Sequence, residues 1–273
     1  MTAPDDLPAR GPDTRLTDAD IARLMPLLEE ASSMELKVSI PMPAQRAAIA
    51  GLPLDPIEAQ PRQVFFFDTP ELTLDRAGLV VRARRIQGGR GDTVVKLRPV
   101  EPASLPADVK RSQAFVIEVD ALPGGFVCSG SLRGRATAAE VKDVADGSLA
   151  LRKILSKEQR ALYAAHAPEG VSLDDLVVLG PTFILKSTFM ARLVERRGAP
   201  ERRFVAEMWL FPDGTRVLEV SLKCLPSDAF QVAAETRAYL ASRGIDITGE
   251  QQTKTRKALS YFGGLAAEEA ASS

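Results

Sequence analysis

Apolar and polar residues alternate with a period of two through much of this sequence. The first such segment covers 33–40, where one face carries Met34, Leu36, Val38 and Ile40 and the other carries Ser33, Glu35, Lys37 and Ser39. Strict alternation over four to eight residues is typical of a β-strand with two different faces. The pattern therefore predicts a strand with one apolar and one charged face.

The same division recurs further along the chain. Three more predicted strands have charged faces, which carry Arg82 and Arg84, then Asp92, Lys96 and Arg98, and then Glu118 and Asp120. Near the C-terminus, 204–211 and 215–224 flank the turn sequence Pro212-Asp213-Gly214, which predicts a β-hairpin. Its charged positions include Glu207, Glu219 and Lys223.

Helices are predicted between these strands. Thr17 with Asp20 three residues later is a capping signal for a helix to about Glu30. Further helical segments are 139–166, 227–243 and 249–262, and the Pro- and Ala-rich segment 99–110 is predicted to be a loop. No long linker interrupts the order, so one α+β domain is expected over 33–262. An N-terminal extension over 1–32 is expected before this domain, with a flexible tail over 1–16 followed by one helix. A second flexible tail is expected after it, over 263–273.

The charged strand faces have two explanations. In an open antiparallel sheet they would face water. Alternatively, about eight strands form a closed antiparallel β-barrel, a tunnel with helices packed outside and the charged faces pointing inward. Buried Lys and Arg side chains need partners of opposite charge. Acidic side chains would be the partners of some of them, and a multiply charged anion with a divalent metal would account for the rest.

Several motifs, taken in order, resemble those of a known superfamily. Ser33-Met34-Glu35-Leu36-Lys37 is similar to a Glu-x-Glu-x-Lys signature in which Ser33 replaces the first Glu. Segment 66–84, with Phe66-Phe67-Asp68-Thr69-Pro70, Gly78-Leu79 and Arg82-Ala83-Arg84, is the strongest match, and Thr93-Val94-Val95-Lys96 follows it. The sequence thus resembles the CYTH, or triphosphate tunnel metalloenzyme, superfamily, which includes class IV adenylate cyclases and thiamine triphosphatases.

The resemblance continues to the last predicted helix. Glu118 and Asp120 are similar to the acidic pair of the middle strand, Lys186 and Arg192 stand at further basic tunnel positions, and Thr253-Lys254 is similar to a Ser-Lys signature. Glu207 and Glu219 lie in the hairpin that carries late metal-binding acids, where Ser221 replaces a second Glu.

The resemblance implies a metal-dependent hydrolase of a triphosphate compound, either inorganic tripolyphosphate or an organic triphosphate. It implies that Glu35 and Lys37 are catalytic, and that the phosphates are bound by Lys37, Arg82, Arg84, Lys96, Lys186, Arg192 and Lys254. It also implies that Mg²⁺ or Mn²⁺ is bound by Glu35, Glu118, Asp120, Glu207 and Glu219. Carboxylates suit these metals, and Lys and Arg suit phosphate oxygens.

Two departures leave other functions open. Ser33 and Ser221 replace carboxylates with neutral hydroxyls, which weakens a metal site more than a phosphate site. A non-catalytic polyphosphate- or nucleotide-binding module is therefore one alternative, and a class IV-type adenylate cyclase is another.

Composition narrows the expected partners. The chain has 35 Lys and Arg residues against 36 Asp and Glu residues, so its formal charge of -1 does not indicate nucleic-acid binding. Two distant cysteines and a single histidine, His166, do not indicate zinc. No apolar run is long enough for a membrane span and no signal peptide is evident, so a cytoplasmic protein is expected. Apolar helix faces could bury against the barrel or against a second copy, which leaves a homodimer possible.

Overall fold

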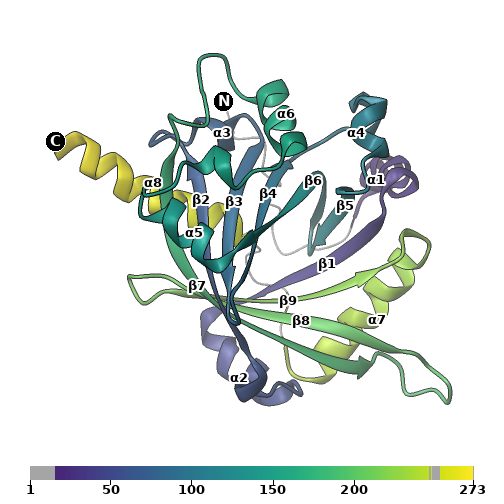
Figure 1. Ribbon diagram of the computed structural model, residues 1–273. Coiled ribbons are helices and arrows are strands. Elements are labelled where there is room, and N and C mark those ends of the chain that lie inside the picture. Colours follow the sequence, from purple (N-terminus) through teal and green to yellow (C-terminus); the bar gives the residue numbers. More distant parts are fainter. Residues whose placement is uncertain (1–15, 246, 248–252, 273) are drawn as a thin grey trace.

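The strands close into one barrel in the computed structural model, which describes residues 16–245, 247 and 253–272 (Figure 1). Within these ranges there are nine strands, and their order around the barrel is β1-β5-β6-β4-β3-β2-β7-β8-β9. Their bounds are β1 Ser33–Ile40, β2 Gln60–Asp68, β3 Leu79–Ile86, β4 Arg90–Leu97, β5 Phe115–Leu122, β6 Gly125–Thr137, β7 Val177–Arg192, β8 Glu201–Leu210 and β9 Arg216–Cys224.

The predicted α+β barrel is confirmed, with two corrections. It has nine strands instead of about eight, and it is mixed, because β1 pairs in parallel with β5 and antiparallel with β9. Side chains alternate in the same way beside a parallel or an antiparallel neighbour, so the period-two pattern carries no information on strand direction. The predicted hairpin is confirmed as β8 and β9.

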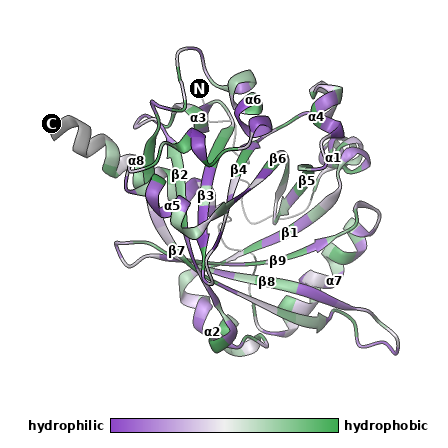
Figure 2. Ribbon diagram, viewed as in Figure 1, coloured by the Kyte–Doolittle hydropathy of each residue, from purple (hydrophilic) through white to green (hydrophobic). Residues whose placement is uncertain are grey.

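The alternation assigns one face of each strand to the outside of the barrel. On β3, Leu79, Val81 and Ala83 are almost completely buried under the covering helices, whereas Arg82 and Arg84 face the interior. Figure 2 shows hydrophilic and hydrophobic residues interleaved along the strands. The main apolar core therefore lies between the barrel wall and the helices, and the interior is left to the polar faces.

Most predicted helices are present, with changed bounds. Helix α1 (Asp18–Glu30) begins with the predicted capping box of Thr17 and Asp20. Segment 139–166 forms two helices, α5 (Ala138–Ala145) and α6 (Lys157–His166), because Gly147 has a positive φ and Ser156 caps the second helix. Helix α7 covers Ala229–Ser242, and the segment predicted as a loop contains the short helix α4 (Ala107–Arg111). Two other short helices are α2 (Gln45–Gly51) and α3 (Thr73–Arg76).

The last helix, α8 (Lys254–Ser272), corrects the predicted tail. It continues past Phe262, so the residues from 263 to 272 are helical. Its Leu259 and Phe262 pack with Phe66 of β2 and Trp209 of β8 in a second apolar cluster, and Figure 1 shows the helix entering beside β2 and β7. Because Phe66 and Trp209 face the barrel interior, α8 closes one end of the barrel.

Some predictions concern residues outside the described ranges. These are most of the N-terminal tail predicted over 1–16 and the predicted helix start at 249–252. Within the described ranges, no helix combines the length and hydropathy needed to cross a membrane.

One close contact between α6 and the barrel is testable. A Cβ atom on Gly134 of β6 would overlap the buried Gln159 Oε1 and Thr93 Oγ1, which are joined by a 3.0 Å hydrogen bond. We expect Gly134→Ala to lower the free energy of unfolding by about 1–3 kcal/mol, measured by chemical denaturation. Gly264→Ala, in open space on α8, is the control and should leave it unchanged or raise it. Equal effects of the two substitutions would contradict this packing.

Candidate functional site

The interior of the barrel encloses a cavity of about 500 Å³. Its wall is formed by the inward faces of strands from around the whole barrel together with the start of α8. Ten basic side chains line it, namely Lys37, Arg82, Arg84, Lys96, Arg98, Arg133, Lys186, Arg203, Lys223 and Lys254. Four carboxylates line it, those of Glu35, Asp92, Glu118 and Glu207. The cavity is therefore strongly positive although the whole chain is nearly neutral.

Strand register brings residues distant in sequence to the same level of the cavity. Lys37 of β1 is opposite Ser221 of β9, and Lys186 of β7 is opposite Glu207 of β8. Directly opposite residues in a sheet point to the same face. Each inward residue therefore meets the inward residue of the neighbouring strand, and opposite charges can pair across strands.

Asp120 of β5 is the centre of a buried charge cluster. Its carboxylate, 1% exposed, lies 2.9 Å from Lys37 Nζ, 3.3 Å from an Arg98 guanidinium nitrogen and 3.5 Å from Lys96 Nζ. Burial alone would raise the pKa of Asp120, but the three positive charges outweigh burial and hold the pKa well below its usual range. Asp120 is therefore ionised, and each of its two oxygens lies close to a basic side chain.

The two lysines of this cluster differ in their pKa. Burial lowers the pKa of Lys96 to about 8; Asp120 acts against this shift, and Arg98 and Lys37 add to it. For Lys37, burial is outweighed by Asp120, Glu35 and Glu219, so its pKa is raised. Lys37 is thus held firmly as a cation, whereas Lys96 is the more easily deprotonated of the two.

A second buried cluster joins β8, β9 and α8. Lys254 forms ion pairs with Glu207 and with Glu219, the latter at 2.7 Å, and Trp209 Nε1 donates a 3.3 Å hydrogen bond to Glu207. Burial would raise the pKa of Glu207, but the charge and hydrogen bond of Lys254 hold the pKa well below its usual range. Glu207 is therefore ionised, and a single ammonium group lies between it and Glu219.

Glu118 of β5 carries a third set of contacts. It pairs with Lys223 of β9 and with Arg133 of β6, the latter at 3.4 Å, and it accepts a 3.4 Å hydrogen bond from Ser33 Oγ. Arg133 and Lys223 are about half exposed, so this cluster is close to solvent. A neighbouring pair, Arg84 and Asp92, joins β3 to β4.

Three basic side chains of the cavity wall remain without such contacts. Among the described residues, Arg82, Lys186 and Arg203 have no ion pair or hydrogen bond through their side chains, and the buried Nε of Arg82 has no partner. Burial, together with the charge of Arg84, lowers the pKa of Arg82 to about 10. Positive charge in the tunnel thus exceeds the negative charge available to balance it.

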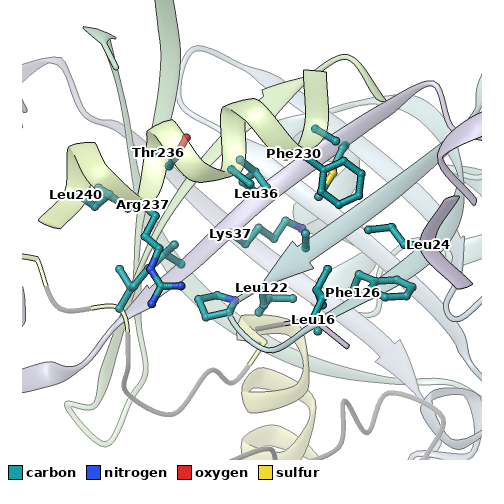
Figure 3. A pocket seen from close by; sticks show the side chains of 18 residues that line it. Leu16, Leu24, Leu36, Lys37, Leu122, Phe126, Phe230, Thr236, Arg237 and Leu240 are labelled. Carbon is teal, nitrogen blue, oxygen red and sulfur yellow. The ribbon is translucent and has the colours of Figure 1, made fainter. Parts of the chain in front are cut away.

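A separate cavity of about 170 Å³ lies outside the barrel, between α1, α7 and the β5–β6 turn. Figure 3 shows Lys37 among its apolar lining, which includes Leu36, Leu122 and Phe230. Lys37 borders both cavities, since its ammonium group pairs with Asp120 inside the tunnel. The apolar lining does not suit phosphate.

Comparisons with known proteins identify the fold. No family model matches the sequence, and no curated protein matches it. Solved structures do match. One is the Hippeastrum protein HpAC1, which is described as a candidate adenylyl cyclase with a dominant triphosphatase activity. Its TM-score is 0.59 and its sequence identity is 16%, and the match covers 83% of this chain and 95% of that chain. Another is a candidate adenylate cyclase from Bacillus halodurans, with a TM-score of 0.55 and 11% identity over 83% of this chain and 97% of that one.

The chain shares its fold with these two proteins. At these identities the likeness establishes the fold alone. It agrees with the motif resemblance in the sequence, and the charged cavity described above is the interior of the barrel in this fold.

The tunnel brings together nearly all of the predicted site residues. Its wall contains Glu35, Lys37, Arg82, Arg84, Lys96, Glu118, Lys186, Glu207 and Lys254. Asp120 and Glu219 are buried and form ion pairs with lysines of this wall. Their proposed roles stay predictions.

Arg192 is the exception. It lies at the far end of β7, where its side chain is 65% exposed and pairs with Glu201 at 3.3 Å. The alternation predicts which face of a strand Arg192 occupies, but it does not show that β7 extends beyond the cavity.

Sequence reasoning did not include four basic wall residues in the site. Arg98 and Lys223 stand at charged positions of predicted strands, and Arg203 precedes the predicted hairpin. Arg133 lies on β6, for which no strand was predicted. The signal that could have found Arg133 is the alternation of Ser129, Ser131 and Arg133 with apolar residues along β6.

The carboxylates do not fit a divalent metal in their present arrangement. Among the described residues, no group of three or more His, Cys, Asp or Glu side chains is placed to hold a metal ion. Each predicted ligand instead contacts a basic side chain, including Glu35, which is 3.4 Å from Lys37. Mg²⁺ and Mn²⁺ need several free oxygen ligands, so metal binding remains a prediction from the motif resemblance.

The Asp120 cluster predicts a large effect on stability. Asp120→Asn leaves three buried positive charges without their common partner, so we expect the free energy of unfolding at pH 7 to fall by about 3–5 kcal/mol in chemical denaturation. Asp174→Asn breaks an exposed pair with Arg152 and should cost about 0–1 kcal/mol. A small effect of Asp120→Asn would show that the cluster does not support the barrel.

Proposed function

We propose that the tunnel binds a compound that carries a triphosphate or polyphosphate group. The observation that carries this proposal concerns the guanidinium of Arg82, which has no ion pair or hydrogen bond among the described residues. It lies in a cavity with ten basic and four acidic wall residues. A buried cation without a partner is costly, and phosphate oxygens are suitable partners for it.

The free basic side chains lie on different strands. Arg82 is on β3, Lys186 on β7 and Arg203 on β8, so a ligand among them would be held by several strands of the barrel. Arg offers two parallel hydrogen bonds to a phosphate, whereas Lys acts as a compact point charge. A ligand with several linked phosphates would satisfy more of these groups than a single phosphate.

Hydrolysis of the bound triphosphate is the second candidate function. Its support is the structural likeness to the Hippeastrum protein, for which a dominant triphosphatase activity is described. In the reaction, Lys and Arg would position the phosphates and stabilise their charge, since phosphoryl transfer depends mostly on positioning and electrostatics. Mg²⁺ or Mn²⁺, if bound, would supply further neutralisation of the phosphates. Cyclisation of ATP is the third candidate.

The binding proposal predicts a large effect of Arg82. We expect Arg82→Gln to weaken tripolyphosphate binding by about 10- to 100-fold in isothermal titration calorimetry, because a charge-assisted hydrogen bond contributes about 1.5–3 kcal/mol. The matched control is Arg192→Gln, which removes an arginine of β7 outside the tunnel and should leave the affinity unchanged. Equal affinities of the two variants would place the ligand outside the tunnel.

A second measurement tests catalysis. Purified protein is incubated with tripolyphosphate or ATP in Mg²⁺, in Mn²⁺ and in EDTA, and orthophosphate and cyclic AMP are quantified. A triphosphatase that uses Glu35 releases orthophosphate, and Glu35→Gln abolishes the release while tripolyphosphate still binds. Cyclic AMP as the main product from ATP would favour a cyclase, and binding without any product would leave a binding module.

A further inference from the structure

Glu207 and Glu219 form a buried pair of carboxylates. They are directly opposite in the β8–β9 register, and they are 9% and 3% exposed. Two neighbouring negative charges that are buried away from water repel each other strongly unless a cation lies between them. The barrel therefore needs a positive charge at this place, whether it comes from a metal ion or from a side chain.

Lys254 supplies that charge. Its ammonium group contacts both glutamates, and it lies 5.5 Å from the centre of the Trp209 ring, where the aromatic face adds attraction for a cation. Lys254 is the first residue of α8, and the N-terminus of a helix disfavours a cation. The two carboxylates, and not the helix, therefore account for the position of this ammonium group.

The other tunnel carboxylates are also neutralised by side chains. Lys37 contacts both Asp120 and Glu35, and Glu118 has Lys223 and Arg133. An ammonium group between two carboxylates uses the oxygens that a metal would need and repels a second cation. Positive charge on the cavity wall is still in excess, because Arg82, Lys186 and Arg203 have no ion pairs within the part of the chain that the structure describes.

We infer that Lys254 takes the place of a divalent cation between Glu207 and Glu219, so that the tunnel binds its phosphate ligand without Mg²⁺ or Mn²⁺. The identity of the ligand rests on the proposed function, but the role of Lys254 does not. In this arrangement the free basic side chains contact the phosphates directly, and the internal ion pairs keep the carboxylates from repelling them.

The experiment compares Mn²⁺ binding by three forms of the protein, measured by isothermal titration calorimetry without phosphate. Lys254→Met keeps an unbranched side chain that is one atom shorter and removes its charge, which leaves the two glutamates free for a metal. The matched control is Lys257→Met on the same helix, where the ammonium group lies 5.4 Å from the centre of the Phe211 ring and does not line the tunnel.

We expect Mn²⁺ to bind Lys254→Met at least about tenfold more tightly than the unsubstituted protein, because a nearby like charge has been removed. Lys257→Met should behave as the unsubstituted protein does. Equal Mn²⁺ affinity of the unsubstituted protein and Lys254→Met would overturn the inference, since the metal would then bind elsewhere or displace Lys254 without cost.

A second arm uses the unsubstituted protein alone, so that it does not depend on the folding of a variant. Tripolyphosphate is titrated in EDTA and in Mn²⁺, and we expect binding in EDTA. Loss of binding in EDTA with binding retained in Mn²⁺ would overturn metal independence. Absence of binding in both conditions would refute the proposed function, and the Mn²⁺ comparison of the variants would still decide the role of Lys254.

Discussion

Charge compensation inside the barrel is the constraint on which the rest of this structure depends. Closing the sheet withdraws most of the charged strand faces from bulk water, and each buried charge is costly unless it is paired. Asp120 with its three basic partners and Lys254 with its two glutamates meet this requirement across strands that are far apart in sequence. The barrel can close because these pairs form together.

The charge compensation is incomplete, and the positive charge that remains unpaired determines what the tunnel can bind. The buried clusters around Asp120 and Glu207 pair positive with negative charge, whereas Arg82, Lys186 and Arg203 have no ion pairs with any described residue. Helix α8 contributes to both features, because its apolar residues close one end of the barrel and Lys254 neutralises two carboxylates there. The surplus positive charge is what makes a multiply charged anion the expected ligand.

Local pattern was sufficient for the strands whose two faces differ clearly. The inward positions of β1, β3 and β4 were predicted correctly, as were the β8–β9 hairpin and the cap of α1. The pattern was not used to predict β7, whose outer face leaves Phe183 and Leu185 exposed. Arg192, which the motif resemblance placed in the tunnel, lies beyond it on this strand. The pattern merged α5 with α6, because helix periodicity on both sides of Gly147 outweighed the turn signal between them.

The sequence by itself determined which residues share a strand face, and through its motifs it indicated the fold and nearly all of the tunnel wall. Only the tertiary structure decided which carboxylate meets which cation. Pairing depends on strand register and on the position of α8, which places Lys254 beside Glu207 and Glu219. A motif shows that a carboxylate is present, but the charge next to it determines whether its oxygens are free for a metal, and that neighbour comes from another part of the chain.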